Sequence, residues 1–124
     1  MPKTGLRYGS YPLTSEKIET KVTRTSPGVY VLDKRSKEGT FIVNYVGRAD
    51  VSVNERLHKW VGSKYKRFKF DYSSSPKVAF EKECEIYHDF GGPGGEMDND
   101  VHPKRPEGTN WQCPKCDVFK GQWW

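Results

Sequence analysis

The triplets Gly28-Val29-Tyr30 and Tyr45-Val46-Gly47 lie in the two stretches of sequence that decide the fold of this chain. Residues 28–32 and 41–46 are rich in β-branched and aromatic side chains, which favour strands. The segment between them, residues 33–40, is charged and contains a glycine, so the sequence predicts a β-hairpin with a solvated loop. Both tyrosines then lie on paired strands. Tyrosines on strands are commonly half-buried sheet residues, so a functional role needs support from elsewhere in the chain.

Length and composition indicate one soluble domain. The chain has 124 residues, of which 34% are hydrophobic and 30% charged, which suits a single modest core. No apolar run approaches the roughly 20 residues of a membrane span, and the N-terminus lacks a secretory apolar segment, so we expect a cytoplasmic protein without a membrane partner. The 21 Lys and Arg residues outnumber the 16 Asp and Glu residues, which favours a polyanionic partner such as DNA or serves only solubility.

Three further elements follow from local patterns. Ser52 is an N-cap residue, and apolar residues recur on one face until Gly62, which predicts a short helix of about ten residues. Residues 67–72 alternate aromatic and mostly basic side chains, which predicts a third strand. Ser75-Pro76 begins a second helix that runs to about Phe90, where a pair of glycines stops it. The expected fold class is α+β.

The sequence divides into three regions. We expect residues 1–25 to form an N-terminal extension that lies over the domain or stays mobile, because few apolar residues recur there. Residues 26–90 form the folded domain. Residues 91–124 change to an irregular, Gly- and Pro-rich composition, so we expect a tail that packs on the domain only if something else orders it.

Glu83 lies near the middle of the apolar stripe of the second predicted helix, which Ala79, Phe80, Ile86 and Tyr87 define. A buried carboxylate is costly unless it is paired or bound to a cation. One alternative is an internal salt bridge with an arginine. The other is a divalent cation, Mg²⁺ or Mn²⁺, for which a carboxylate is a hard oxygen ligand.

Arg56 lies at the edge of the apolar face of the first predicted helix. Its guanidinium can reach over the sheet from there, or it can remain a solvated surface group. A shared cleft would explain the combination of Tyr30, Tyr45, Arg56 and Glu83.

The order of these features along the chain resembles the GIY-YIG endonuclease family, in particular its excision-repair branch. The set consists of the two tyrosine triplets, Arg48 after the second triplet, Arg56, the basic aromatic strand and Glu83. The resemblance covers about residues 26–90, and its specificity lies in the ordered set. It implies a small three-stranded antiparallel sheet flanked by helices, and hydrolysis of DNA phosphodiester bonds with one divalent metal ion.

The resemblance also implies a role for each residue. Glu83 would hold the metal ion, and Arg48 and Arg56 would supply positive charge to the transition state. A motif tyrosine would take the proton from the attacking water. We assign that role to Tyr30 and the orienting role to Tyr45, although the reverse assignment is almost equally supported.

The sequence departs from the family pattern at several positions. Val29 and Val46 replace the motif isoleucines. Trp60 stands where many members carry a histidine, and His58 is a displaced candidate for that role. Asn99 is the best match for an asparagine that closes the site of the family. These departures bear on turnover more than on the fold.

The region around the third predicted strand is the most basic part of the chain. It contains Lys64, Lys66, Arg67 and Lys69. We expect these side chains to bind nucleic acid, because clustered cations attract the phosphate backbone.

Cysteine and histidine residues suggest a second metal site. Cys84 and His88 lie one helical turn apart, and Cys113 and Cys116 form a C-x2-C knuckle. Together they make a ligand set for a tetrahedral Zn²⁺ that clips the tail onto the second helix. His102 can replace His88 in this set, which leaves His88 to face the catalytic cleft. The remaining alternative is three free thiols, since an odd number of cysteines cannot all pair internally.

The favoured function is therefore that of a divalent-metal-dependent DNA endonuclease with a structural zinc ion. A non-catalytic nucleic-acid-binding module with the same fold and zinc site is the alternative. A protein-interaction domain is a third possibility, which the Gln122-Trp123-Trp124 terminus favours. Because the chain has no evident second DNA-recognition domain, a homodimer mate or a protein partner would supply specificity.

Overall fold

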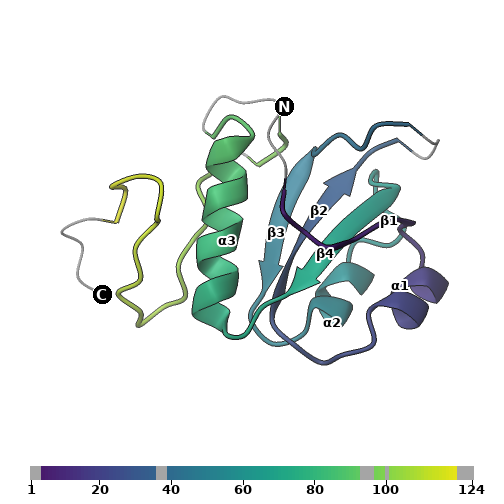
Figure 1. Ribbon diagram of the computed structural model, residues 1–124, viewed down its shortest axis with the longest axis horizontal. Coiled ribbons are helices and arrows are strands. Elements are labelled where there is room, and N and C mark those ends of the chain that lie inside the picture. Colours follow the sequence, from purple (N-terminus) through teal and green to yellow (C-terminus); the bar gives the residue numbers. More distant parts are fainter. Residues whose placement is uncertain (1–3, 36–38, 93–96, 100, 120–124) are drawn as a thin grey trace.

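The computed structural model describes residues 4–35, 39–92, 97–99 and 101–119 (Figure 1). The fold is α+β, as predicted. The predicted Gln122-Trp123-Trp124 interaction segment lies outside the described residues. In chain order, the elements are β1 (Tyr8–Pro12), α1 (Ser15–Lys21), β2 (Gly28–Asp33), β3 (Tyr45–Ala49), α2 (Val53–His58), β4 (Arg67–Tyr72) and α3 (Pro76–Asp89).

The sheet has four antiparallel strands in the order β1-β4-β2-β3, so the prediction of three strands is wrong. The additional strand, β1, comes from the region predicted as an extension, and it pairs with β4 so that Tyr8 lies opposite Phe70. Its sequence YGSYP contains glycine and proline, which strands disfavour. Tertiary contacts compensate, since the rings of Tyr8 and Phe70 stack with centroids 5.1 Å apart.

The predicted hairpin is formed by β2 and β3. In its register Tyr30 lies opposite Gly47, and Tyr45 lies opposite Leu32. However, β3 begins at Tyr45 and not at residue 41. The N–H of Ile42 instead donates to the Asp33 carboxylate at 2.9 Å, so a side chain replaces the strand partner that the β-rich sequence led us to expect.

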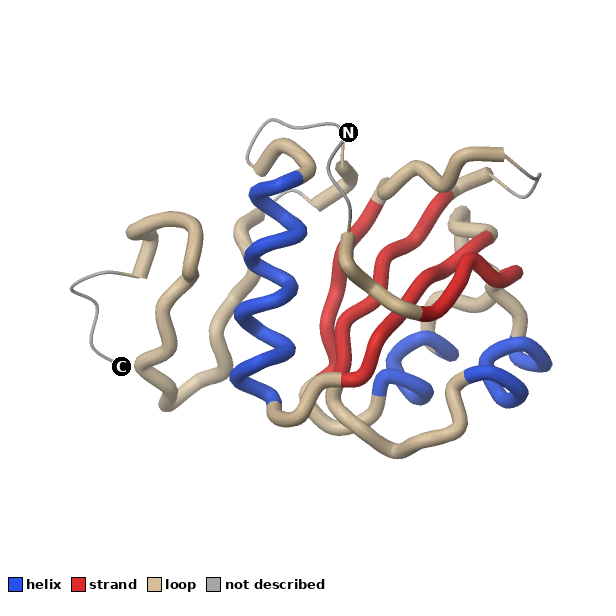
Figure 2. Tube along the Cα trace, in the orientation of Figure 1, coloured by secondary structure: helices blue, strands red, loops and turns tan. Residues whose placement is uncertain are grey.

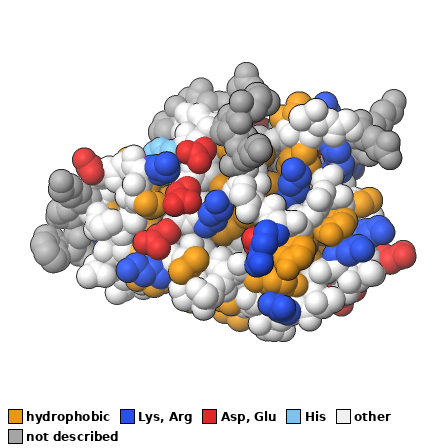
Figure 3. Space-filling model, in the orientation of Figure 1, with side chains coloured by type: hydrophobic (Ala, Val, Ile, Leu, Met, Phe, Trp, Pro, Cys, Tyr) orange, Lys and Arg blue, Asp and Glu red, His pale blue; other side chains and the backbone are white. Residues whose placement is uncertain are grey.

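Helices cover both faces of the sheet (Figures 1 and 2). On the face of α1 and α2, the core contains Ile18, Tyr30, Leu32, Leu57, Phe68 and Phe70. On the face of α3, the core contains Val29, Val31, Val46, Ala79, Ile86 and Tyr87. α3 contacts β3 and β2. Figure 3 shows Lys and Arg side chains spread among hydrophobic side chains over the β1 and β4 half of that face.

The starts of α2 and α3 follow the local sequence closely. Ser52 and Ser75 cap α2 and α3, as their side-chain oxygens accept the N–H groups of Glu55 at 3.3 Å and Val78 at 3.2 Å. α2 is shorter than predicted and ends at His58. The chain continues in tight turns, in which the N–H of Trp60 donates to the carbonyl of Leu57 at 3.0 Å.

The described residues after α3 form neither helix nor strand. They run beside α3 (Figure 2), where Phe80, Cys84 and Cys113 form a small buried cluster against which Trp111 and Phe119 pack. Within the described residues, no helix combines the length and the apolar character that a membrane span requires.

Candidate functional site

A polar cleft lies at the β3 edge of the sheet, where α2 approaches from one face and α3 from the other. Its volume is ≈ 320 Å³. Five of the six predicted catalytic residues line this cleft. The complete lining consists of Tyr30, Tyr45, Gly47, Arg48, Asp50, Arg56, Trp60, Glu83 and Lys104.

Tyr30 enters the cleft by crossing over Gly47. Only a glycine fits at position 47, because a Cβ atom there would collide with the phenol ring of Tyr30. The Tyr30 hydroxyl accepts a hydrogen bond from Nε1 of Trp60 at 2.9 Å. Tyr30 is 2% exposed, and this burial raises its pKa, although the bond from Trp60 acts in the opposite direction. Tyr30 is therefore a neutral phenol held in one orientation.

Tyr45 is the more accessible of the two tyrosines. Its ring is half-buried and packs against Trp60, with centroids 4.8 Å apart. Within the described residues its hydroxyl has no hydrogen-bond partner. Burial and the nearby Glu83 carboxylate raise its pKa. Its hydroxyl is thus free to bind a water molecule or a substrate.

Arg48 and Glu83 form a largely buried ion pair. Nη1 of Arg48 lies 2.7 Å from Oε1 of Glu83, and Nε of Arg48 lies 2.9 Å from the carboxylate of Asp50. Burial raises the pKa of Glu83 to about 7, because the loss of hydration outweighs the opposing attraction of Arg48. The internal salt bridge considered for Glu83 from the sequence is present.

Arg56 and Lys104 are the cations of the cleft that have no carboxylate partner within the described residues. Both line the cleft, so both can contact an anion. Sequence patterns did not identify Lys104, because it lies in an irregular tail where no periodicity assigns a direction to a side chain.

His58 and Asn99 do not line the cleft, contrary to what their sequence positions suggested. Nδ1 of His58 lies 3.1 Å from the carbonyl of Asn54, which turns the imidazole along its own helix. Asn99 accepts from the N–H of Val46 at 3.0 Å and donates to its carbonyl at 2.9 Å. Its amide therefore satisfies the open edge of β3 as a neighbouring strand would.

The basic residues around β4 differ in burial and in their partners. Arg67 is 7% exposed and its Nη2 lies 2.5 Å from the carboxylate of Asp33. The expectation that Arg67 binds nucleic acid therefore conflicts with its burial. Nζ of Lys64 lies 3.5 Å from the Asp98 carboxylate, Lys66 donates to a carbonyl of its own loop, and Nζ of Lys69 lies 5.0 Å from the ring centre of Phe41. These three lysines remain candidates.

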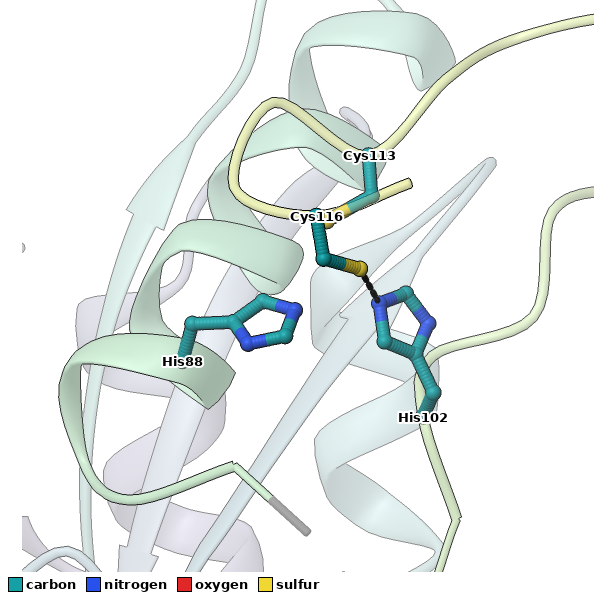
Figure 4. Close-up of side chains that lie close together, drawn as sticks. All are labelled: His88, His102, Cys113 and Cys116. Atoms are coloured by element: carbon teal, nitrogen blue, oxygen red, sulfur yellow. Dashed lines mark hydrogen bonds between the residues drawn. The ribbon is translucent and has the colours of Figure 1, made fainter. Parts of the chain in front are cut away.

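A second constellation lies on the outer side of α3. One ligand atom from each of His88, His102, Cys113 and Cys116 lies within 4.8 Å of the other three. Figure 4 shows His88 on α3 and His102 on the tail pointing toward the Cys113 to Cys116 turn, with Nε2 of His102 3.4 Å from Sγ of Cys116. Nε2 of His88 is buried and has no hydrogen-bond partner within the described residues. This group could hold a metal ion.

Cys84 does not belong to this group, although the sequence pattern placed it among the zinc ligands. It is fully buried with Phe80 and Cys113, and burial raises the pKa of its thiol. Both histidines, which the sequence offered as alternatives, are present together. One helical turn separates Cys84 from His88. Cys84 packs against Cys113 of the tail, but only His88 belongs to the four-residue group.

The cleft also has carboxylate oxygens that can bind a divalent metal ion. Oε1 of Glu83 accepts a hydrogen bond from Arg48. The other carboxylate oxygen of Glu83 has no hydrogen-bond partner within the described residues. Asp50 adds a second carboxylate at the same cleft. One or two carboxylates at a hydrated cleft are the protein ligands that Mg²⁺ usually has, so the donor set fits a divalent ion.

Comparisons with known proteins found no protein family, curated protein or solved structure that matches this chain. The candidate site therefore rests on its own residues and their geometry.

Proposed function

We propose that this chain is an endonuclease that hydrolyses DNA phosphodiester bonds with a divalent metal ion in the cleft at the edge of β3. One observation carries the proposal. The residues that suit this reaction come from β2, β3, α2 and α3, yet they line one cleft, and they are Tyr30, Tyr45, Arg48, Arg56 and Glu83.

Arg56 is the first candidate to bind the phosphodiester. A site that cleaves this bond must neutralise the charge on the phosphate oxygens. A guanidinium can do so with paired hydrogen bonds, and the side chain of Arg56 has no competing carboxylate among the described residues. Arg48 already contacts Glu83 and Asp50. We therefore assign Arg48 to positioning these two carboxylates.

Glu83 and Asp50 are the residues that would hold Mg²⁺ or Mn²⁺. When bound, the cation supplies positive charge that stabilises the phosphate oxygens and the departing oxygen. Because the pKa of Glu83 is raised to about 7, the carboxylate becomes a better ligand as the pH rises through neutrality.

Tyr45 is the better candidate to accept the proton of the attacking water. Its hydroxyl is accessible and without a partner among the described residues, whereas Tyr30 is buried and already accepts the bond from Trp60. We therefore reverse the assignment suggested by the sequence: Tyr45 contacts the water, and Tyr30 orients the cleft. Both hydroxyls are protonated in the free protein. Tyr45 must therefore first release its own proton to bulk water, and its phenolate oxygen then takes one proton from the attacking water.

The four-residue group on α3 and the tail is proposed to hold a structural Zn²⁺. Two imidazoles and two thiolates are a common tetrahedral zinc set. With four protein ligands such a site has no open position for a substrate. The binding free energy would order a tail that has no helix or strand among its described residues.

A non-catalytic nucleic-acid-binding module remains the second candidate. The ion pair between Arg48 and Glu83 favours it, because the arginine pairs with the buried carboxylate without any metal ion. In that case the cleft would bind a phosphate and not cleave it.

Cleavage assays separate the two candidates. Purified protein is incubated with supercoiled, nicked, branched and single-stranded DNA, with Mg²⁺, with Mn²⁺ or with neither. We expect strand breaks only with a divalent ion, and a rate that falls roughly 10²- to 10³-fold in Arg56→Gln. Lys17→Gln removes the same charge from the surface of α1, where Lys17 is partly exposed, and should cleave like the wild type. Binding without cleavage would favour the second candidate, and neither would favour a protein-interaction domain.

A further inference from the structure

Lys104 connects the two constellations of this protein. It lines the polar cleft with Tyr45, Arg56 and Glu83, and only Pro103 separates it from His102 of the four-residue metal group. Lys104, a residue of the tail, is therefore part of the cleft wall and lies two residues from His102 of the metal group.

The backbone on both sides of Lys104 is held in place. Pro103 and Arg105 are buried, whereas Lys104 is exposed. Arg105 donates to the carbonyl of Trp111 at 3.0 Å, and its guanidinium lies 4.7 Å from the ring centre of Phe119. The ammonium group of Lys104 is thus carried by an anchored segment of irregular chain.

The segment is also joined to the metal group through His102. Nδ1 of His102 lies 2.8 Å from the carbonyl of Pro103, and its Nε2 points to Cys116. Within the described residues, the tail has no regular hydrogen-bonded element to hold this segment. A metal ion that joins His102 to His88 would fix the segment to α3, the helix that also carries Glu83.

We propose that Lys104 contacts a phosphate group of the nucleic acid in the cleft, and that the metal ion on His88, His102, Cys113 and Cys116 holds Lys104 there. The metal site then serves substrate binding as well as the stability of the tail. This inference rests on the proposed function, because it takes the ligand of the cleft to be a polynucleotide.

Two consequences follow from the chemistry of phosphate binding. A lysine that neutralises one phosphate of duplex DNA contributes about 0.9 to the slope of log affinity against log salt concentration. Its loss therefore weakens binding roughly five- to tenfold near 0.1 M salt. Removing the metal ion should have the same effect, because it withdraws the same contact.

The experiment measures the affinity of the full chain for a short fluorescein-labelled DNA duplex by anisotropy, without Mg²⁺ and over a range of salt concentrations. The proteins are the wild type, Lys104→Gln, Lys104→Arg and Lys17→Gln, each loaded with Zn²⁺ or stripped by a chelator. Circular dichroism checks that the α+β domain stays folded after stripping.

We expect Lys104→Gln to bind five- to tenfold more weakly with a slope reduced by about 0.9, and Lys104→Arg and Lys17→Gln to bind like the wild type. Stripping should weaken the wild type to the level of Lys104→Gln and leave Lys104→Gln almost unchanged, and added Zn²⁺ should reverse the loss. If stripping and Lys104→Gln each weaken DNA binding independently, so that the two factors multiply, the metal ion does not act through Lys104. That result would overturn the proposed link between the metal site and Lys104. Equal binding by Lys104→Gln and Lys17→Gln would overturn the contact of Lys104 with a phosphate. Loss of the α+β domain on stripping would overturn the proposal, which requires that domain to persist.

The two proposals fail in different ways. If the wild type binds DNA with the expected dependence on Lys104 and metal but never cleaves it, the endonuclease function fails and the role of Lys104 stands. If the wild type cleaves DNA and Lys104→Gln binds DNA as tightly as the wild type does, the endonuclease function stands and the role of Lys104 fails. A wild type that does not bind DNA overturns both.

Discussion

The indole N–H of Trp60 donates a hydrogen bond to the phenolic oxygen of Tyr30 at 2.9 Å. The indole ring also packs against Tyr45, with ring centroids 4.8 Å apart. From the resemblance in sequence we expected a histidine at this position. In this chain the position has an indole that fixes one tyrosine and supports the other.

The two tyrosine hydroxyls should differ in their effect on stability. Tyr30→Phe leaves the N–H of Trp60 without its acceptor in a partly buried site, which should lower the free energy of unfolding by about 1 to 2 kcal/mol. Tyr45→Phe removes a hydroxyl without a partner among the described residues and should change the free energy of unfolding by less than about 0.5 kcal/mol. Urea unfolding followed by tryptophan fluorescence measures both values.

Tyr45→Phe should also separate activity from stability. Tyr45→Phe should be stable but should cleave DNA much more slowly, if Tyr45 accepts the proton of the water. A Tyr45→Phe protein with wild-type cleavage would return that role to Tyr30.

Gly47 should tolerate no side chain while Tyr30 is present. A Cβ atom at position 47 would meet the Tyr30 ring, so Gly47→Ala should destabilise the protein by about 1 to 3 kcal/mol through overpacking. In a Tyr30→Leu background the same change should cost much less, because the ring is gone. The four free energies of unfolding form a double-mutant cycle, and additive values would show that the close approach is not the cause.

Glu83 should make the metal-free protein less stable as the pH rises. The folded state holds the Glu83 proton up to a pKa of about 7, above the ordinary value of 4.5. Its contribution to stability is therefore complete below about pH 4.5 and declines, by an amount on the order of 2 to 3 kcal/mol, as the pH rises to 7. Urea unfolding between these pH values, without divalent ions, measures the decline.

Glu83→Gln is the control for this pH dependence. Glutamine keeps an oxygen for Arg48 and has no charge to desolvate, so the difference between wild type and variant isolates Glu83 from other titrating groups. The variant should lack this part of the decline. Identical pH profiles would show that the ion pair with Arg48 keeps Glu83 ionised at acidic pH.

The metal site should bind one zinc ion per chain through the four residues of the constellation. Alanine at His88, His102, Cys113 or Cys116 should reduce the zinc content measured by elemental analysis and lower the melting temperature. Cys84→Ala is the matched control, because Cys84 lies beside the site but outside the ligand group. Loss of zinc in Cys84→Ala with retention in His102→Ala would restore the ligand set predicted from the sequence.

Local sequence patterns predicted the elements that local chemistry determines. The N-caps Ser52 and Ser75, the extent of α3 and the pairing of β2 with β3 follow from caps, periodicity and turn composition. β1 did not, because its glycine and proline disfavour a strand. It is held in the sheet by pairing with β4 and by ring contacts with Phe68 and Phe70. The inward direction of Glu83 was predictable because the helical period fixes where each side chain points.

The irregular tail limited what could be predicted of the site. The C-x2-C knuckle was recognisable, but which helical residue faces it depends on the path of the tail. The spacing alone therefore predicts Cys84 as a ligand in addition to His88. His102 was offered only as a replacement. Lys104 had no pattern to identify it, since its place in the cleft comes entirely from the tertiary path of the tail.

The most direct test of the proposed function is the single-turnover rate of DNA strand cleavage with Mg²⁺ by wild type, Glu83→Gln and Glu81→Gln. Both substitutions remove one carboxylate from α3, but only Glu83 lines the cleft. We predict that Glu83→Gln is slower by a factor on the order of 10³, as expected when a group that stabilises the transition state is lost, while Glu81→Gln keeps the wild-type rate. Equal cleavage by the wild type and Glu83→Gln would contradict the assignment of the cleft as the active site.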